Sequence, residues 1–255
     1  MGKYFTVEVK PVMTPVNAGL NAAFGDGDVL FDWTSFNIPK GAAKLIGITA
    51  EIRPKGDSGS TPNIFPFELL FAKSKLRATD GELVAPTTLG ALNSAPAASA
   101  AIQTQTDMYI GHAPIVAGDF GVTDQLAVAS AAAPEGLVLE GHPNSGINVG
   151  YDMLYVGGIA GGAFNFVSET LINNGDLDGP TMTTDGTDPR LFIAAGDTVA
   201  VCTDADNTAT KAMGIVDSMT ATSIVLTEAF TTADVANNDI VYNTSPIRLM
   251  LTFEK

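Results

Sequence analysis

Hydrophobic and polar residues alternate at both ends of the chain. Residues 4–10 alternate between two faces and stop at Pro11, and residues 247–255 alternate in the same way. The second segment places one row of apolar side chains on a single side: Ile247, Leu249, Leu251 and Phe253. A repeat of two residues is typical of a β-strand with one buried face. We therefore expect a strand at each end, and we expect the two strands to pair or to lie close together.

Four internal segments show the same pattern, at residues 29–36, 44–53, 65–72 and 153–166. A turn is expected between the first two, at residues 38–42, where Pro and Gly occur. Two rows of core residues are expected, namely Ile46, Ile48 and Ile52 in the second segment and Phe67, Leu69 and Phe71 in the third. Together these segments predict an antiparallel, jelly-roll-like β-sandwich.

Two stretches, residues 84–106 and 113–145, are rich in Ala, Ser, Thr, Gly and Pro and have weak periodicity. Residues 126–133 are expected to form a short helix that Pro134 ends. We interpret the rest of both stretches as long ordered loops, or as arms that reach a neighbouring subunit. Loops of this length favour a role in an assembly.

The last quarter of the chain has shorter strands. A turn-dense bridge at residues 173–189 is followed by five short strand patterns, at 191–194, 197–203, 211–218, 223–227 and 239–242. Because long-strand alternation resumes at residue 247, these strands predict a small β-barrel at 190–245, inserted into the sandwich. The main domain would then comprise residues 1–189 and 246–255.

The charge distribution narrows the range of partners. The chain of 255 residues has a net charge of −15, and residues 78–189 contain thirteen acidic and no basic residues. This excess argues against nucleic-acid and anionic-membrane binding, which need clustered Lys and Arg. The excess of acidic residues has two interpretations. It keeps the protein surface soluble, or it belongs to a polarised subunit whose near-neutral segment 1–77 docks on a partner while the acidic middle faces solvent. The chain shows no signal-peptide pattern and no apolar run of membrane-spanning length, so we expect a soluble protein.

The residues that most often perform catalysis are few and dispersed. The chain has one cysteine, Cys202, and two histidines, His112 and His142, and none belongs to a recognisable nucleophile or zinc pattern. We expect no catalytic residue, no cofactor and no metal site. One alternative stays open: an acidic loop at 176–188 that could bind calcium through Asp176, Asp178, Asp185 and Asp188, although the full calcium-loop pattern is absent and turn-forming Asp is favoured.

The glycine-rich segment at residues 157–162 does not open a helix, so it does not predict a phosphate-binding loop. We expect Gly157 and Gly158 to allow close backbone approach within a sheet or across a subunit contact. Asp204, Asp206 and Asn207 are expected to form a hairpin turn in the barrel. With one Trp, Trp33, and five Tyr, an aromatic carbohydrate platform is thinly supported.

The barrel strands carry the most specific motifs. These are residues 196–201, 213–226 and 238–242, in which Gly196 and Asp197 open a turn, Gly214 allows a tight crossing, and Ile224 and Leu226 point inwards. The module resembles a β-module common in virion proteins of tailed bacteriophages. Short phrases of the main body resemble jelly-roll proteins associated with phage shells, at residues 36–42, 67–73, 89–93 and 155–160.

The resemblance implies a capsid decoration (cement) protein, often a homotrimer, that binds the major capsid protein from outside and bridges neighbouring capsomers. It would be made in the host cytoplasm and would reside on the virion surface. No catalytic residue carries over. The alternatives are a tail, baseplate or fibre component with a role in host attachment, and an enzyme such as a polysaccharide depolymerase.

Overall fold

The structure is a computed structural model that describes the chain except for residues 1, 16–18, 58, 60–61, 98–106, 124–125, 135, 144–148, 174–178, 204–209 and 230–234. The described residues contain β-strands and two short 3-10 turns, η1 (Ala117–Asp119) and η3 (Pro189–Leu191), but no α-helix. The sequence prediction of an all-β fold is therefore confirmed.

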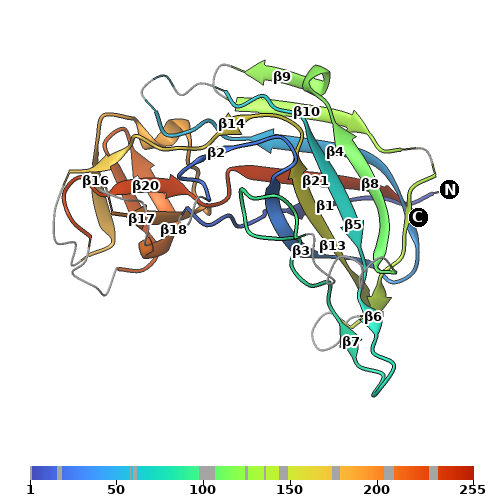
Figure 1. Ribbon diagram of the computed structural model, residues 1–255. Helices are drawn as coiled ribbons and strands as arrows, with labels where there is room; N and C mark the ends of the chain where they lie inside the picture. Colours follow the sequence, from blue (N-terminus) through green and yellow to red (C-terminus); the bar gives the residue numbers. More distant parts are fainter. Residues whose placement is uncertain are drawn as a thin grey trace.

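Two antiparallel sheets form the main body (Figure 1). In spatial order, the first sheet contains β1 (Tyr4–Val9), β21 (Ile247–Glu254), β4 (Ala43–Ile52), β10 (Leu126–Ala132) and β9 (Phe120–Thr123), with β11 (Val138–Leu139) beside β4. The second contains β3 (Val29–Pro39), β13 (Tyr151–Ala160), β5 (Phe67–Ala72) and β8 (Tyr109–Ile115), with β12 (His142–Pro143) beside β13. Two small pairs complete this part: β2 (Ala23–Phe24) with β14 (Phe164–Asn165), and β6 (Lys75–Leu76) with β7 (Leu83–Val84).

The order of the longer strands defines the topology. If β1, β3, β4, β5, β8, β10, β13 and β21 are numbered one to eight along the chain, the first sheet follows 1-8-3-6 and the second 2-7-4-5. Each sheet thus alternates strands from distant parts of the sequence, as in a jelly-roll-like double sheet. The expected pairing of the two ends is confirmed, because β1 runs antiparallel to β21 from Tyr4↔Glu254 to Val9↔Leu249.

The same topology corrects the polarised-subunit interpretation of the charge pattern. Segment 1–77 supplies β1 and β4 to one sheet and β3 and β5 to the other. It therefore supplies two of the four longer strands of each sheet and does not form one end of the molecule. The docking of this segment on a partner stays a prediction.

The core lies between the two sheets, and most predicted rows reach it. Ile247, Leu249, Leu251 and Phe253 are all 0% exposed, and Phe67, Leu69 and Phe71 are also buried. In β4 the expected row is wrong at one position: Leu45 is buried and Ile46 is only half-buried. A β-bulge is the reason, because Thr252 pairs with Gly47 whereas Phe253 pairs with Leu45. The extra residue shifts the alternation by one.

The predicted helix at residues 126–133 is also wrong, because Leu126–Ala132 is strand β10. It pairs with β4 on one side and β9 on the other. Ala127 and Ala129 face the core and are fully buried. Alanine favours helix in isolation, but pairing on both edges overrides this propensity. Much of the stretch 113–145, interpreted as loops or arms, is therefore sheet.

The inserted barrel is confirmed as a closed six-stranded unit, and its core is separate from that of the sandwich. Its strands are β15 (Leu171–Ile172), β16 (Thr181–Asp185), β19 (Ser223–Leu226), β18 (Thr210–Thr220), β17 (Thr198–Cys202) and β20 (Ile240–Asn243), in spatial order. The barrel begins earlier than expected, since β15 and β16 precede residue 190. The expected strand at 191–194 is instead the end of η3 and a turn.

The expected details of the barrel are confirmed. Ile224 and Leu226 are buried in its core, and a Cβ on Gly214 would lie 2.8 Å from Leu226 Cδ1. Gly196 has φ +84°, which suits glycine in the turn that precedes Asp197. Asp204, Asp206 and Asn207 lie outside the described residues.

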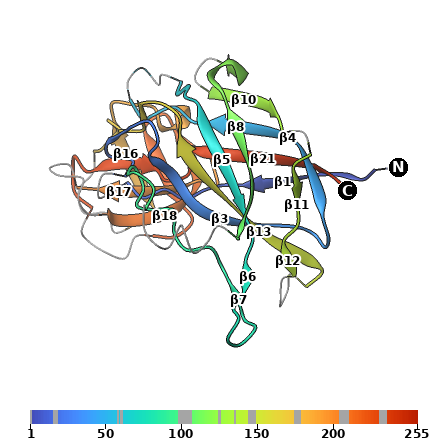
Figure 2. The ribbon, with the colours of Figure 1, turned by 45° about the vertical axis from the view of Figure 1, so that its right-hand side comes forward.

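Two views show how the parts are arranged (Figures 1 and 2). The barrel lies at one end of the sandwich, and both chain termini lie at the opposite end. The β6–β7 hairpin projects from the sandwich as a narrow extension, with Leu76 and Leu83 exposed on it.

Candidate functional site

A polar cleft of about 300 Å³ lies where the sandwich meets the barrel. It is lined by Glu8, Lys10, Arg53, Ala194, Ala195, Asp197, Ser245 and Arg248. The sandwich contributes residues from the ends of β1, β4 and β21, and the barrel side contributes the turn before β17 and the linker after β20. We name this feature the junction cleft. It contains three of the thirteen basic residues of the chain.

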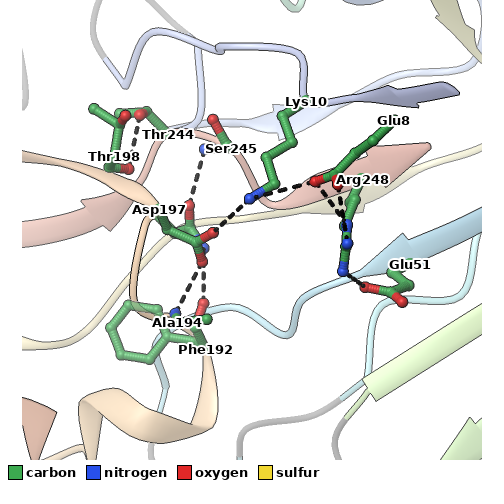
Figure 3. A network of polar contacts seen from close by, with 11 residues as sticks. Glu8, Lys10, Glu51, Phe192, Ala194, Asp197, Thr198, Thr244, Ser245 and Arg248 are labelled. Carbon is green, nitrogen blue, oxygen red and sulfur yellow. Dashed lines mark hydrogen bonds and ion pairs between the residues drawn. The ribbon is translucent and has the colours of Figure 1, made fainter. Parts of the chain in front are cut away.

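Arg248 organises the sandwich side of the cleft (Figure 3). Its Nε and Nη2 donate to the two carboxylate oxygens of Glu8 at 2.9 and 3.1 Å, and its Nη1 donates to Glu51 at 3.2 Å. Strand alternation places all three side chains on the polar outer face of the first sheet, and Arg248 pairs directly with Glu51 across β21 and β4. A two-point contact between guanidinium and carboxylate fixes orientation as well as charge.

Asp197 organises the barrel side. Its carboxylate accepts a hydrogen bond from the Ala194 backbone N–H at 2.9 Å and one from Asn243 Nδ2 at 3.3 Å. Asn243 also donates to the Phe192 carbonyl at 2.8 Å. Because Asp197 is buried, these donors compensate for the loss of water around its charge.

Lys10 connects the two sides. Its Nζ lies 3.5 Å from Glu8 and 3.9 Å from Asp197, so it stands between the sandwich network and the barrel network (Figure 3). The backbone supports the same junction, since Met13 N–H donates to the Thr244 carbonyl, which follows β20, at 2.7 Å.

A second contact, at Gly56, reinforces the junction. The Gly56 carbonyl accepts hydrogen bonds from Glu169 N–H at 2.7 Å and from the Thr170 hydroxyl at 3.1 Å. A Cβ on Gly56 would come within 2.8 Å of the Phe192 ring. The barrel residues Cys202, Ile240 and Tyr242 also belong to the core cluster of the sandwich. Sandwich and barrel therefore pack as one body.

The network changes proton affinities in the expected directions. Hydrogen bonding from Arg248 lowers the pKa of Glu8, and the same contact raises the pKa of Arg248. Both groups therefore stay charged over a wider pH range. Arg53 differs from its neighbours, because no acidic side chain pairs with it among the described residues. The junction cleft thus offers one guanidinium that can receive a carboxylate or another anion.

The structure does not bring the predicted chemical residues together. His112 lies on β8 and contacts the Glu68 carboxylate on β5, whereas His142 lies on β12, with β13 and β5 between the two histidine strands. Cys202 is a free thiol buried in β17, and burial raises its pKa to about 11. The two histidines therefore lie on different strands near the surface, and Cys202 is part of the packed interior.

The calcium alternative is only partly covered by the described residues, since Asp176 and Asp178 lie outside them. Asp185 is exposed at the end of β16, and Asp188 caps η3 by accepting from Arg190 N–H at 3.0 Å. Over the part of the chain that the structure covers, no group of three or more His, Cys, Asp or Glu side chains could hold a metal ion.

Sequence reasoning missed two groupings. The junction cleft needs the register between β4 and β21, although the alternation of residues 247–255 already places Arg248 on the polar face. An aromatic pair was also missed: the Trp33 and Tyr109 rings lie 5.6 Å apart, although 76 positions separate them in the sequence. The Trp33 ring also lies against Gly157, where a side chain would clash with Leu89.

Within the described ranges, no helix has the length and apolar character needed to cross a membrane. Compared with known protein families and with curated proteins, the sequence matches no family model and no curated protein.

Proposed function

We propose that this chain is a virion structural protein that decorates the outside of an icosahedral capsid. In this proposal it binds the major capsid protein, bridges neighbouring capsomers and acts as a homotrimer on the capsid surface after synthesis in the host cytoplasm. The proposal assigns it no enzymatic activity and no contact with nucleic acid or membrane.

One observation carries the proposal: a jelly-roll-like sandwich bears an inserted barrel that is locked to it. Double-sheet jelly rolls occur in viral shell proteins and lectins. A protein that bridges capsomers must also be stiff, because a hinge between its parts would let the capsomers move independently. The Lys10–Asp197 contact and the hydrogen bonds to Gly56 supply this stiffness at the junction.

A second candidate function is a tail, baseplate or fibre component that attaches to the host. The observation in its favour is the Trp33–Tyr109 pair, since paired aromatic rings are suited to stacking against sugars. Both residues are half-buried, so a sugar would reach only part of each ring.

Copy number separates the two candidates. We would purify particles and measure the ratio of this chain to the major shell protein by quantitative mass spectrometry. A copy number comparable with that of the shell protein is expected for decoration. A few copies per particle, or recovery only with isolated tails, would contradict it. Adding purified protein to particles that lack it provides the second arm, with rebinding expected to saturate at the same ratio.

A further inference from the structure

Strand β1 forms one outer edge of the first sheet. This strand pairs with β21 on one side, and in the described part of the chain no strand pairs with its other side. Lys3 and Lys255 exchange backbone hydrogen bonds of 3.1 and 2.9 Å. Because antiparallel pairs alternate, the backbone groups of Tyr4, Thr6 and Glu8 point away from β21. They form an open row of donors and acceptors.

The side chains of β1 also lack cover. Phe5 and Val7 face the core but are only partly buried, whereas the inward residues of the neighbouring β21 are fully buried. Tyr4 is 66% exposed, on the outer face of the strand. An additional strand at this edge would cover Phe5 and Val7 and would satisfy the open backbone groups at the same time.

The corresponding edge of the second sheet is protected. At β3, the Val29 N–H donates to the Ser94 carbonyl and the Val29 carbonyl accepts from Asn93 N–H, at 2.9 and 2.8 Å. Leu89 N–H donates to the Asp32 carboxylate, also at 2.8 Å. Residues 89–94 thus cover the beginning of β3, at Val29 and Asp32. Natural sheets usually cover or block their edges, so an edge strand with open backbone groups, such as β1, is available for pairing with another chain.

We propose that β1 pairs with β1 of a second copy of this chain, antiparallel and across a two-fold axis. Only one register aligns all the outward-pointing backbone groups. It places Thr6 opposite Thr6 of the second copy and Tyr4 opposite Glu8 of the second copy, and forms about six hydrogen bonds. The two first sheets then join into one continuous sheet, a common mode of strand addition.

Charge complementarity supports this register. It places Lys10 opposite Gly2 of the second copy, and within each copy the Glu254 carboxylate lies directly above Gly2, with Oε1 2.9 Å from the position of a Cβ there. The register thus brings Lys10 of each copy toward the Glu254 carboxylate of the other, beside the contact of Lys10 with Glu8 in its own copy. The same register keeps the two Glu8 carboxylates apart, which avoids like charges opposite one another. The contact is independent of the capsid proposal: it joins copies in pairs across a two-fold axis and is distinct from the three-fold contact of the proposed homotrimer.

A cysteine at the axis tests the proposal. In a hydrogen-bonded antiparallel pair the Cα atoms lie about 5.5 Å apart, within disulfide range. Thr6→Cys is expected to form a covalent dimer in oxidising buffer, seen on a non-reducing gel. The native Cys202 is buried and does not compete. The matched control is Thr252→Cys, since Thr252 pairs directly with Thr6 on β21. Its two copies would lie about 14 Å apart, three strand spacings, and should not cross-link.

A second variant tests the backbone contact. Thr6→Pro removes an N–H that points away from β21, so the fold should tolerate it while pairing is blocked. Sedimentation velocity is expected to show that the wild-type mass is twice that of Thr6→Pro, with unchanged circular dichroism. Absence of the Thr6→Cys dimer, equal cross-linking of Thr252→Cys, or equal masses for wild type and Thr6→Pro would overturn the proposal. If Thr6→Pro does not fold, the comparison of Thr6→Cys with Thr252→Cys tests the proposal by itself.

Discussion

At the scale of single residues, positions without a side chain shape the sandwich as much as the large core residues do. Gly157 and Gly158 occupy adjacent positions in β13, and their missing Cβ atoms face opposite sides of the sheet. A Cβ on Gly157 would overlap Leu89, and a Cβ on Gly158 would overlap the Phe31 ring. The space at both glycines is therefore filled by side chains of neighbouring segments, and not by a closely approaching backbone as the sequence suggested.

We expect Gly158→Ala to lower the free energy of unfolding by about 1–3 kcal/mol, because the added methyl must displace the buried Phe31 ring. Chemical denaturation measures this change. Gly118→Ala is the control, since no atom lies within 4 Å of a Cβ at that position. Equal stabilities for the two variants would show that the Phe31 ring moves to accept the methyl group without a loss of stability.

Glu8 gives the molecule a defined response to pH. Hydrogen bonding from Arg248 lowers the pKa of Glu8 in the folded state. The contribution of Glu8 to the free energy of unfolding is therefore fully present above the unfolded pKa of about 4.3, and it is lost as pH falls through the folded pKa. We expect Glu8→Gln to lower stability at pH 7 by about 0.5–1 kcal/mol, a value limited by solvent screening.

Thermal unfolding of Glu8→Gln and wild type across the acidic range checks this expectation. The difference between them should shrink as pH falls and should weaken at high salt. The exposed Glu228→Gln serves as the control. A difference that stays constant down to strongly acidic pH would show that packing, and not charge, is the source.

At the scale of elements, β10 shows where sequence patterns fail. Residues 126–133 are rich in alanine, and local propensity favours a helix. The strand conformation of β10 depends on its pairing with two other strands. One is β4, which is distant in the sequence, and the other is β9, which precedes β10 across a short connection. The bulge at Ile46 is a similar case. Alternation found the strand, but only the pairing with β21 sets its phase. By contrast, β1, β5 and β21 alternate so regularly that their residues alone predicted them.

Substitutions at Ser130 test the strand state directly. Ser130 is exposed and pairs with Thr49 on β4. We expect Ser130→Thr to stabilise the protein by about 0.2–1 kcal/mol, because Thr pairs well with Thr across strands. Ser130→Ala should destabilise it, although alanine is the better helix former. The reverse order of melting temperatures would favour the helix that the sequence suggested.

At the scale of the whole molecule, the junction cleft joins the two units. The barrel was predicted from its turn spacing, but the cleft was not, because its residues come from widely separated parts of the chain. Arg248 and Glu8 meet only after β1 and β21 pair, and Asp197 approaches Lys10 only when the barrel closes. The buried Tyr242 belongs to a barrel strand yet lies in the sandwich core cluster.

This packing predicts that sandwich and barrel unfold together. Differential scanning calorimetry of the whole protein is expected to show one cooperative transition. Tyr242→Ala should lower the stability of that single transition by about 3–5 kcal/mol. Two resolved transitions, with only the barrel transition affected by Tyr242→Ala, would mean that the units are independent and that the junction is not stiff.

The proposed role on the capsid is tested most directly by a density map of the particle. We expect density for the sandwich and its barrel on the outer surface of the shell, where each copy contacts more than one capsomer and keeps the geometry of the junction cleft. Density for this fold only in the tail or baseplate, or only on the inner surface of the shell, would contradict it.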